Sequence, residues 1–233
     1  MLDYLRKQTI FILKIDVMSR YIVLFLMFCC GMGLQGAGAQ GIPTVYVETA
    51  DGEEVVSKEE WKEGTGLRIV LPDGRVDYES ERAAARGRGH STFTKPKKPY
   101  AIKLEKKSGL LGMAPGKRWG LLANFMDHSL MRNSLAFSMA ALTELEWTPD
   151  WRFVNVVYNG QSRGCYLLCE QVRVGDCRVD IDEKEGYLLE VDSYFDEPCR
   201  FRTARRSLPV NVKAPDDPSP EQMAYIEGYL NEI

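Results

Sequence analysis

The sequence predicts an α+β fold built mainly of antiparallel strands, with one main helix inserted between them. Three patterns favour this class. Apolar and polar residues alternate over residues 42–49, as in a strand with one buried face. Asn159-Gly160 joins two strand-like segments in the manner of a tight hairpin. Residues 127–145 are the one long helical pattern between strand segments, so repeated βαβ units are not expected.

The first half of the chain contains three expected strands. Residues 42–49 are followed by an Asp-Gly turn, and residues 67–71 end at a Pro-Asp-Gly turn. Residues 75–85 are expected only to lead into a glycine-rich segment. Residues 99–104 form a short third strand, in which Lys103 faces away from the apolar side.

The main helix is expected to begin at Asp127, whose side chain is a suitable N-cap, and to continue to residue 145. Its apolar residues recur at helical spacing and predict a stripe that packs in the core. The stripe consists of Met131, Leu135, Met139 and Leu142.

The second half contains the clearest hairpin of the chain. Residues 152–158 and 161–172 flank Asn159-Gly160, and both of these residues tolerate the positive φ angles of a type I′ turn. A further strand is expected over residues 186–191.

A second helix is expected near the end of the sequence. Ser219 is its predicted N-cap, Pro220 occupies the first helical position, and Gln222 completes a capping box. Its apolar stripe either docks on the domain or requires a partner beyond residue 233, and we interpret the domain as truncated at its C-terminus. The stripe consists of Met223, Ile226, Leu230 and Ile233.

The N-terminus predicts export. Residues 21–34 are an apolar run that follows Arg20 and precedes Ala37-Gly38-Ala39, the pattern of a signal peptide with its cleavage site. We therefore interpret residues 1–39 as a signal peptide, with Met18 favoured over Met1 as initiator, and residues 40–233 as the mature domain. The mature protein is expected to have no permanent membrane span and to lie in the periplasm, at the cell surface or outside the cell.

Cations gather between residues 86 and 103, where six Lys or Arg side chains occur without an acid, although the net charge of the chain is −3. An exported chain with that net charge is not expected to bind nucleic acid, so the cluster indicates a smaller anion. Two histidines are too few for a histidine-based site, and no metal ligands are predicted. Cys177 and Cys199 are suited to form a disulfide in an oxidising compartment, but the sequence does not decide their state.

Five segments taken together resemble the CotH kinase family, the secreted relatives of the spore coat protein H kinase. The resemblance extends from about residue 44 to residue 233. Family members show Asn and Trp where this sequence has His90 and Phe93, so a hydrogen bond that requires an amide at position 90 is not expected. The segments are RGRGHSTFTKPKKPYAIKL (86–104), LLANFMDHSLMRNSLAF (121–137), VVYNGQSRGCYLLCEQV (156–172), GYLLEVDSYFDE (186–197) and VNVKAPD (210–216).

The resemblance implies an atypical protein-kinase fold that transfers phosphate from ATP to protein serine with Mg or Mn. Residues 40–233 would form a kinase-like small lobe of antiparallel strands with one main helix, and the C-terminal lobe would be largely missing. Lys103 is the first predicted ATP contact, because a lysine on a strand pairs with the phosphates in kinases. Arg88 and Lys98 are further predicted contacts, and solvated cations on a strand edge are the alternative for all three.

Other polar residues of these segments have less defined expected roles. Glu170, at the end of the hairpin, either fixes a loop that faces the adenine or pairs with a lysine. For Arg132 and Asn133 we favour a structural role, bonded to a neighbouring carbonyl or acid.

The catalytic part of the resemblance is incomplete. In the family, the acids that orient the hydroxyl and hold the metal lie in N-x-D and W-D-F-D segments, which these 233 residues do not contain. Glu190 and Asp192 do not match them, so no catalytic residue is assigned, and this chain alone is not expected to transfer phosphate. The alternative is a non-catalytic surface or binding protein that retains the fold. Neither the substrate protein nor the oligomeric state is predicted.

Overall fold

The computed structural model describes residues 41–182 and 184–232. The predicted signal peptide, its cleavage site and both candidate initiators lie outside these residues. Within the described part of the chain, no helix is both long enough and apolar enough to cross a membrane.

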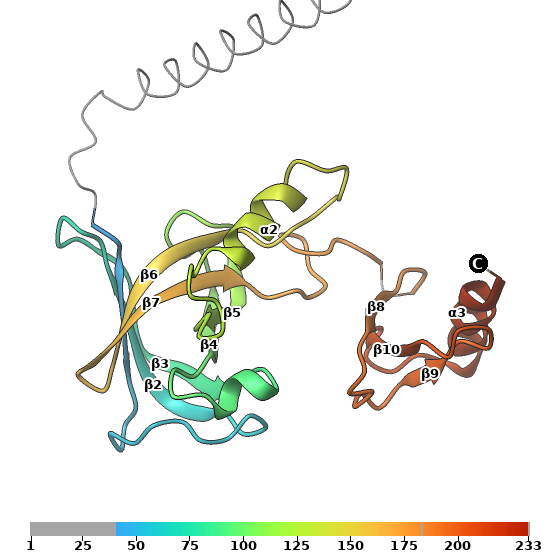
Figure 1. The fold of residues 1–233 in the computed structure, drawn as a ribbon, viewed down its shortest axis with the longest axis horizontal. Coiled ribbons are helices and arrows are strands. Elements are labelled where there is room, and N and C mark those ends of the chain that lie inside the picture. The colour runs from blue at the N-terminus through green and yellow to red at the C-terminus, as the bar shows by residue number, and fades with distance from the viewer. Residues whose placement is uncertain (1–40, 183, 233) are drawn as a thin grey trace, which may run out of the picture. The chain divides into compact units, whose positions relative to one another are not determined.

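Seven strands close into a barrel in the order β1-β2-β3-β4-β5-β7-β6 (Figure 1). Neighbouring strands pair antiparallel except β1 and β6, whose parallel pairing closes the barrel. The predicted α+β class is confirmed, and the closed barrel is a more specific arrangement than the sequence predicted. The strands are β1 (Thr44–Glu48), β2 (Lys62–Val70), β3 (Val76–Gly87), β4 (Tyr100–Ser108), β5 (Gly116–Leu122), β6 (Trp151–Tyr158) and β7 (Gln161–Glu170).

The barrel interior is the main core of the domain. Trp119, Tyr100, Tyr158 and Tyr166 are its largest fully buried side chains. On β4, the buried residues Ile102 and Leu104 flank Lys103, which is half-buried and faces the other side of the strand, as the alternation predicted. The inner positions of the barrel are therefore filled with apolar and aromatic side chains, and ligand contacts must come from its rim or outer face.

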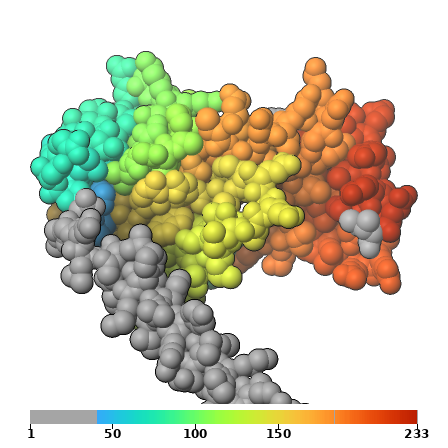
Figure 2. All heavy atoms as spheres, turned by 90° about the horizontal axis from the view of Figure 1, so that it is seen from above, coloured from blue at the N-terminus to red at the C-terminus, as the bar shows by residue number. Residues whose placement is uncertain are grey.

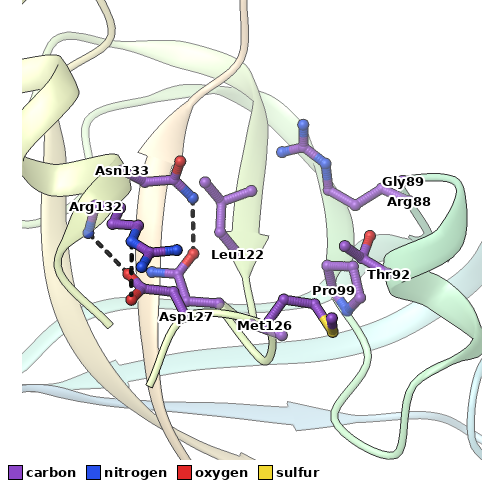
Figure 3. Close-up of a pocket in the computed structure, with 11 residues that line it drawn as sticks. Arg88, Gly89, Thr92, Pro99, Leu122, Met126, Asp127, Arg132 and Asn133 are labelled. Atoms are coloured by element: carbon purple, nitrogen blue, oxygen red, sulfur yellow. Dashed lines mark hydrogen bonds and ion pairs between the residues drawn. The ribbon is translucent and has the colours of Figure 1, made fainter. Parts of the chain in front are cut away.

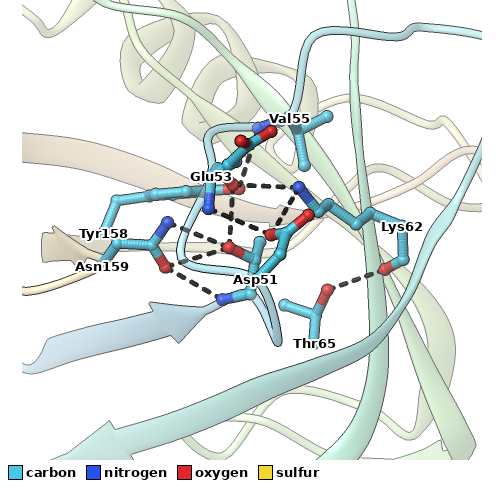
Figure 4. A network of polar contacts seen from close by, with 8 residues as sticks. Asp51, Glu53, Val55, Lys62, Thr65, Tyr158 and Asn159 are labelled. Atoms are coloured by element: carbon cyan, nitrogen blue, oxygen red, sulfur yellow. Dashed lines mark hydrogen bonds and ion pairs between the residues drawn. The ribbon is translucent and has the colours of Figure 1, made fainter.

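A polar network joins the turn of the β6–β7 hairpin to the segment that follows β1 (Figure 4). Asn159 and Gly160 have φ values of 47° and 75°, as the predicted tight turn requires. The Asn159 side chain accepts a hydrogen bond from Thr49 N at 2.9 Å and donates one to Thr49 Oγ1 at 3.0 Å. The Tyr158 hydroxyl accepts a bond from Val55 N at 3.3 Å. One turn therefore both shapes the hairpin and fixes the neighbouring loop at this end of the barrel.

The first helix, α2, differs from its prediction in length and in packing. It spans Arg132–Ala140 instead of 127–145, and its one buried residue is Ser134. The predicted core stripe is wrong, because Met131, Leu135, Met139 and Leu142 are 58–87% exposed. Figure 2 shows the yellow-green atoms of this part of the chain at the surface. The α2 helix is therefore held by something other than burial of its apolar residues.

A three-stranded sheet follows the barrel, in the order β8-β10-β9 with antiparallel pairing. Its strands are β8 (Leu188–Val191), β9 (Arg200–Arg202) and β10 (Pro209–Ala214), and the helix α3 (Pro220–Glu232) comes after them. The predicted capping box is confirmed, because Ser219 Oγ accepts from Gln222 N and Gln222 Oε1 accepts from Ser219 N.

Three residues of the predicted α3 stripe find their packing on this sheet. Ile226 is buried in a cluster with Phe201, Val210 and Val212, and Met223 and Leu230 pack against it. Of the two alternatives for this helix, the structure therefore shows docking for the stripe residues that it describes. The fourth, Ile233, lies outside the described residues.

Candidate functional site

Arg88 lies where the glycine-rich segment leaves β3, and its side chain crosses the surface of β5. The chain turns there with Gly89 at φ 76°, and Arg88 N donates to Pro99 O at 3.2 Å. A Cβ atom on Gly120 would lie 2.2 Å from Arg88 Nη1 and 3.2 Å from Cys169 Sγ. Gly120 therefore provides the space in which the guanidinium lies, and any larger residue would displace it.

The thiol of Cys169, on the neighbouring strand β7, lies close to the Arg88 guanidinium. Burial raises the pKa of Cys169 to about 11, while the charge and a hydrogen bond of Arg88 act in the opposite direction. Cys165, Cys177 and Cys199, like Cys169, are free thiols.

The first cavity beside Arg88 has a volume of about 320 Å³ (Figure 3), and we call it the Asp127 cavity. In Figure 3, Arg88, Thr92 and Pro99 lie on one side of it, and Asp127, Arg132 and Asn133 lie on the other. It thus joins the glycine-rich segment to the chain between β5 and α2, two segments that the sequence separates. Its lining residues are Arg88, Gly89, Thr92, Pro99, Leu122, Ala123, Asn124, Met126, Asp127, Arg132 and Asn133.

Asp127 organises the start of α2 without being its N-cap residue. Its carboxylate accepts hydrogen bonds from Arg132 N at 2.8 Å and from Ser129 Oγ at 2.7 Å. The backbone N–H of Arg132, followed by the Ser129 hydroxyl, holds the pKa of Asp127 below its usual value. The carboxylate therefore satisfies an N–H at the first turn of the helix from one turn earlier in the chain.

An amide pair completes the same wall. Asn124 has φ 49°, and its side chain accepts from Asn133 Nδ2 at 2.7 Å and donates to Leu130 O at 3.0 Å. Arg132 Nε lies 3.7 Å from Asp127 Oδ1. The structural role predicted for Arg132 and Asn133 therefore agrees with their contacts, and these polar bonds hold α2 in place of an apolar stripe.

The second cavity beside Arg88 has a volume of about 340 Å³, and we call it the Glu170 cavity. It joins the end of β7 to the strands β8 and β10. It shares Arg88 and Leu122 with the Asp127 cavity, so the two adjoin at these residues. Its lining residues are Arg88, Leu122, Phe137, Pro149, Cys169, Glu170, Gln171, Val172, Leu188, Leu189, Glu190 and Lys213.

Glu170 is buried and paired with an arginine instead of a lysine. Arg178 Nη1 lies 2.8 Å from Glu170 Oε1, within ion-pair distance but without the alignment of a hydrogen bond, and Asp150 N donates to Oε2 at 3.1 Å. Burial raises the pKa of Glu170 in spite of the opposing influence of both partners. Glu170 therefore ties the loop that carries Arg178 to the end of β7.

Lys213 faces Glu190 across the β8–β10 pair. Lys213 Nζ lies 3.6 Å from Glu190 Oε2 and also pairs with Glu197. Burial acts to lower the pKa of Lys213 and is the largest single influence, but the two carboxylates together raise it. No role was predicted for this lysine, because the acids that pair with it lie on other segments of the sheet.

His90 connects the glycine-rich segment to the segment after β8. Its ring stacks on Tyr194 with 3.3 Å between ring centres, and its Nε2 lies 3.9 Å from Asp192 Oδ2. The histidine at this position therefore contributes a ring contact, where an asparagine would offer an amide.

The structure brings two of the four predicted ATP contacts together. Arg88 and Glu170 both line the Glu170 cavity, whereas Lys103 and Lys98 line neither cavity. Lys103 pairs with Glu63 and lies 5.1 Å from the ring centre of Trp61. Lys98 lies 3.8 Å from Glu54.

Arg88 differs from these lysines in its charge partners. Among the described residues, no carboxylate lies within ion-pair distance of its guanidinium, while Lys98, Lys103, Lys213 and Arg178 each have an acid. Arg88 is therefore the cation at the junction of the two cavities whose charge is left for a ligand.

The comparisons with known proteins agree with the five segments that meet here. A family model described as CotH kinase protein matches residues 85–233. The matched range contains all five segments. None of the curated proteins compared with the chain matches it.

Proposed function

Because this chain belongs to the CotH kinase family, as its sequence predicted, we propose that it binds ATP with the phosphates against Arg88. One observation carries the proposal. Segments that are spread over residues 86–216 converge on two adjoining cavities that share Arg88 and Leu122, and each segment contributes lining residues. Packing of a barrel does not require this, since most of the lining residues lie outside the core.

The chemistry of Arg88 suits a phosphate. A guanidinium presents a planar set of N–H donors that matches phosphate oxygens, and it keeps its charge at any physiological pH. Gly89, with φ 76°, lines the Asp127 cavity beside Arg88. Residues 170–172 continue from β7 along the other cavity, in the position where a nucleotide-binding hinge follows the last strand of a kinase small lobe.

The order of the elements along the chain supports a kinase-like interpretation of the barrel. The elements β5, α2, β6 and β7 follow one another as a strand, a helix and two strands before residues 170–172. In this proposal the barrel corresponds to the small lobe, and the parallel pairing of β1 with β6 closes its sheet.

The family also implies Mg or Mn, and the acids that line the two cavities do not fit such an ion. Asp127 accepts from the backbone N–H of Arg132 at the start of α2, Glu170 is paired with Arg178, and Glu190 faces Lys213. Within the described residues, no group of three or more His, Cys, Asp or Glu side chains is arranged as a metal site. We therefore assign no step of phosphate transfer to these residues and propose nucleotide binding as the function of this chain.

Isothermal titration of the full chain with ATP tests the proposal. Arg88→Gln should weaken binding by tenfold to a hundredfold, since a hydrogen bond to a charged group contributes about 1.5–3 kcal/mol. Lys103→Gln is the matched variant from the same basic segment, and it also tests the ATP contact that the sequence predicted. If Lys103→Gln abolishes binding and Arg88→Gln leaves it unchanged, the cavity assignment is wrong.

Transfer is tested separately with radiolabelled ATP, Mg or Mn, and a serine-rich acceptor. We expect no labelled acceptor. Transfer that disappears in Arg88→Gln would show that the chain is a complete kinase and would overturn the restriction to binding.

We also propose that the protein is exported, on the strength of the apolar run and the Ala37-Gly38-Ala39 site. Mass spectrometry of the protein from its natural source should find Gln40 at the N-terminus. A protein that retains residue 1 would contradict export by this route.

A further inference from the structure

A third concave surface is lined by residues of β4, β5 and the loop after β7, and Arg88 is not among them. It has a volume of about 280 Å³, and we call it the Arg173 pocket. It shares Gln171 with the Glu170 cavity and no residue with the Asp127 cavity. Its lining residues are Lys107, Pro115, Gly116, Lys117, Arg118, Gln171, Arg173, Val174, Gly175, Asp176, Cys177 and Arg178.

The Arg173 pocket has an excess of positive charge. Five of its lining residues are cations and one, Asp176, is an acid. Arg178 is neutralised by Glu170, which leaves Lys107, Lys117, Arg118 and Arg173. None of these four has a carboxylate within 4.0 Å among the residues that the structure describes. They come from β4, β5 and the loop after β7, so the fold gathers them and the sequence does not.

The cations also act on one another. Arg118 is half-buried, and its guanidinium lies 4.3 Å from the ring centre of Trp61, which Arg86 and Lys103 also approach. Burial first, and then the charges of Arg173 and Arg86, lower the pKa of Arg118, and the charge of Glu63 opposes them. Repulsion among like charges at a partly buried site is relieved when an anion binds between them.

The size and composition of the pocket indicate what the anion is. A single carboxylate would neutralise one of the four cations, whereas a group with several phosphate-type charges would neutralise most of them. Arginine forks also match phosphate oxygens in geometry. We propose that the Arg173 pocket binds a compact oligoanion of the phosphate type, either free or carried on a peptide side chain.

Tripolyphosphate titrated into the full chain is the probe. Arg173→Gln and Arg118→Gln should each weaken its binding about tenfold, equivalent to about 1.4 kcal/mol. Arg205→Gln, which removes an exposed cation outside the pocket, is the matched control and should leave the affinity unchanged. Thermal unfolding of each variant establishes that the fold is retained. A phosphoserine peptide and tripolyphosphate in parallel titrations distinguish a peptide-borne group from a free one.

The design separates this site from the proposed nucleotide site. Tripolyphosphate binding should persist in Arg88→Gln, and ATP binding that depends on Arg88 should persist in Arg173→Gln. The inference falls if the double variant Arg118→Gln/Arg173→Gln binds tripolyphosphate as the wild type does, or if Arg88→Gln alone abolishes that binding. It also falls if an oligothymidine binds more tightly than tripolyphosphate through the same two arginines. An oligothymidine of about 12 nucleotides is suitable, because this length is within the site sizes of proteins that bind single-stranded DNA.

Discussion

Replacing Arg178 with methionine should destabilise the domain by about 3–5 kcal/mol. Arg178 and Glu170 form a buried ion pair at 2.8 Å, with side chains that are 7% and 3% exposed. Without the guanidinium, the carboxylate stays in the interior without its ion-pair partner and keeps the hydrogen bond from the N–H of Asp150. Salt screens a pair at this depth only weakly. The expected loss is a large part of a typical stability of about 5–15 kcal/mol.

The loss should become smaller at acid pH. Burial already raises the pKa of Glu170 in the folded state, and removing Arg178, which lowers it, raises that pKa further. An acid with a raised folded-state pKa costs no stability below its unfolded pKa, and its cost grows as the pH rises through the folded pKa. The difference between wild type and Arg178→Met should therefore be larger at pH 7 than at a pH near the ordinary glutamate value of about 4.3.

Urea denaturation of both proteins at the two pH values measures this difference. Arg82→Met is the matched control, because Arg82 pairs with Glu105 at 3.1 Å on the surface, with side chains 78% and 42% exposed. Its stability should change by less than about 1 kcal/mol. Arg178→Met/Glu170→Leu removes both charges and should recover most of the loss. A single variant as stable as the control, or a double variant no more stable than the single one, would refute the reasoning.

Four further changes test other parts of the fold. Gly120→Ala should weaken ATP binding at least tenfold (~1.4 kcal/mol) with little change in melting temperature, since its Cβ would displace the flexible end of Arg88; unchanged titration would contradict this. Asn159→Ala should lower the urea-unfolding free energy by about 1–3 kcal/mol, because it loses both the Thr49 bonds and a residue suited to φ 47°. Asn159→Gly should recover only the conformational part. Leu135→Lys should change stability by less than about 0.5 kcal/mol, as a surface substitution does. A loss above about 2 kcal/mol would show that Leu135 packs in the core, as the sequence predicted. Ser219→Ala should cost about 1 kcal/mol by removing the cap of α3, and an unchanged unfolding curve would show that the cap contributes nothing.

Alternation of apolar and polar residues identified most of the predicted strands, although β10 alternates and was not predicted. The expected segments 42–49, 99–104 and 186–191 correspond to β1, β4 and β8. β3 was missed because its first part is polar and its buried part is Ala83, Ala84 and Ala85, which indicate a strand only weakly. β5 begins with Gly-Lys-Arg, and its apolar residues are too few to show a period.

The closure of the barrel could not be predicted from periodicity. The parallel pairing of β1 with β6 places Thr44 opposite Asn155. Alternation states which face of each strand is buried, but it does not identify the neighbouring strand across such a separation in sequence.

The helix prediction was wrong for an identifiable reason. Met131, Leu135 and Met139 have the spacing of a core stripe, yet α2 presents Ser134 to the interior. Asp127 and Asn124 fix the start of this helix through N–H, carbonyl and amide groups. Such polar bonds leave no periodic trace in the sequence, so the apolar spacing dominated the interpretation.

The candidate site was predictable to the extent that residue type and position along the chain determine it. Arg88 and Glu170 were selected from the five segments, and they line one cavity. Lys213 was missed, because its role depends on Glu190, which the β8–β10 pairing brings to it. Lys103 has the position in its strand that the sequence predicted, but it pairs with Glu63 and lies beside Trp61, away from both cavities.

Charge pairing, more than charge content, distinguishes the places where this chain can take an anion. The basic segment that the sequence singled out contains six cations, yet Lys98 and Lys103 each have a carboxylate partner, and Lys97 donates to a carbonyl. A paired cation must lose its carboxylate partner before it can bind an anionic ligand. Exchanging one ion pair for another adds little to the binding free energy. Among the residues that the structure describes, Arg88 has no such partner, and neither do Arg118 and Arg173 in the Arg173 pocket. The two proposed anion sites are therefore cavities lined by cations that have no carboxylate within ion-pair distance among the described residues, and only the second of them lies outside the segment where the sequence concentrates its cations.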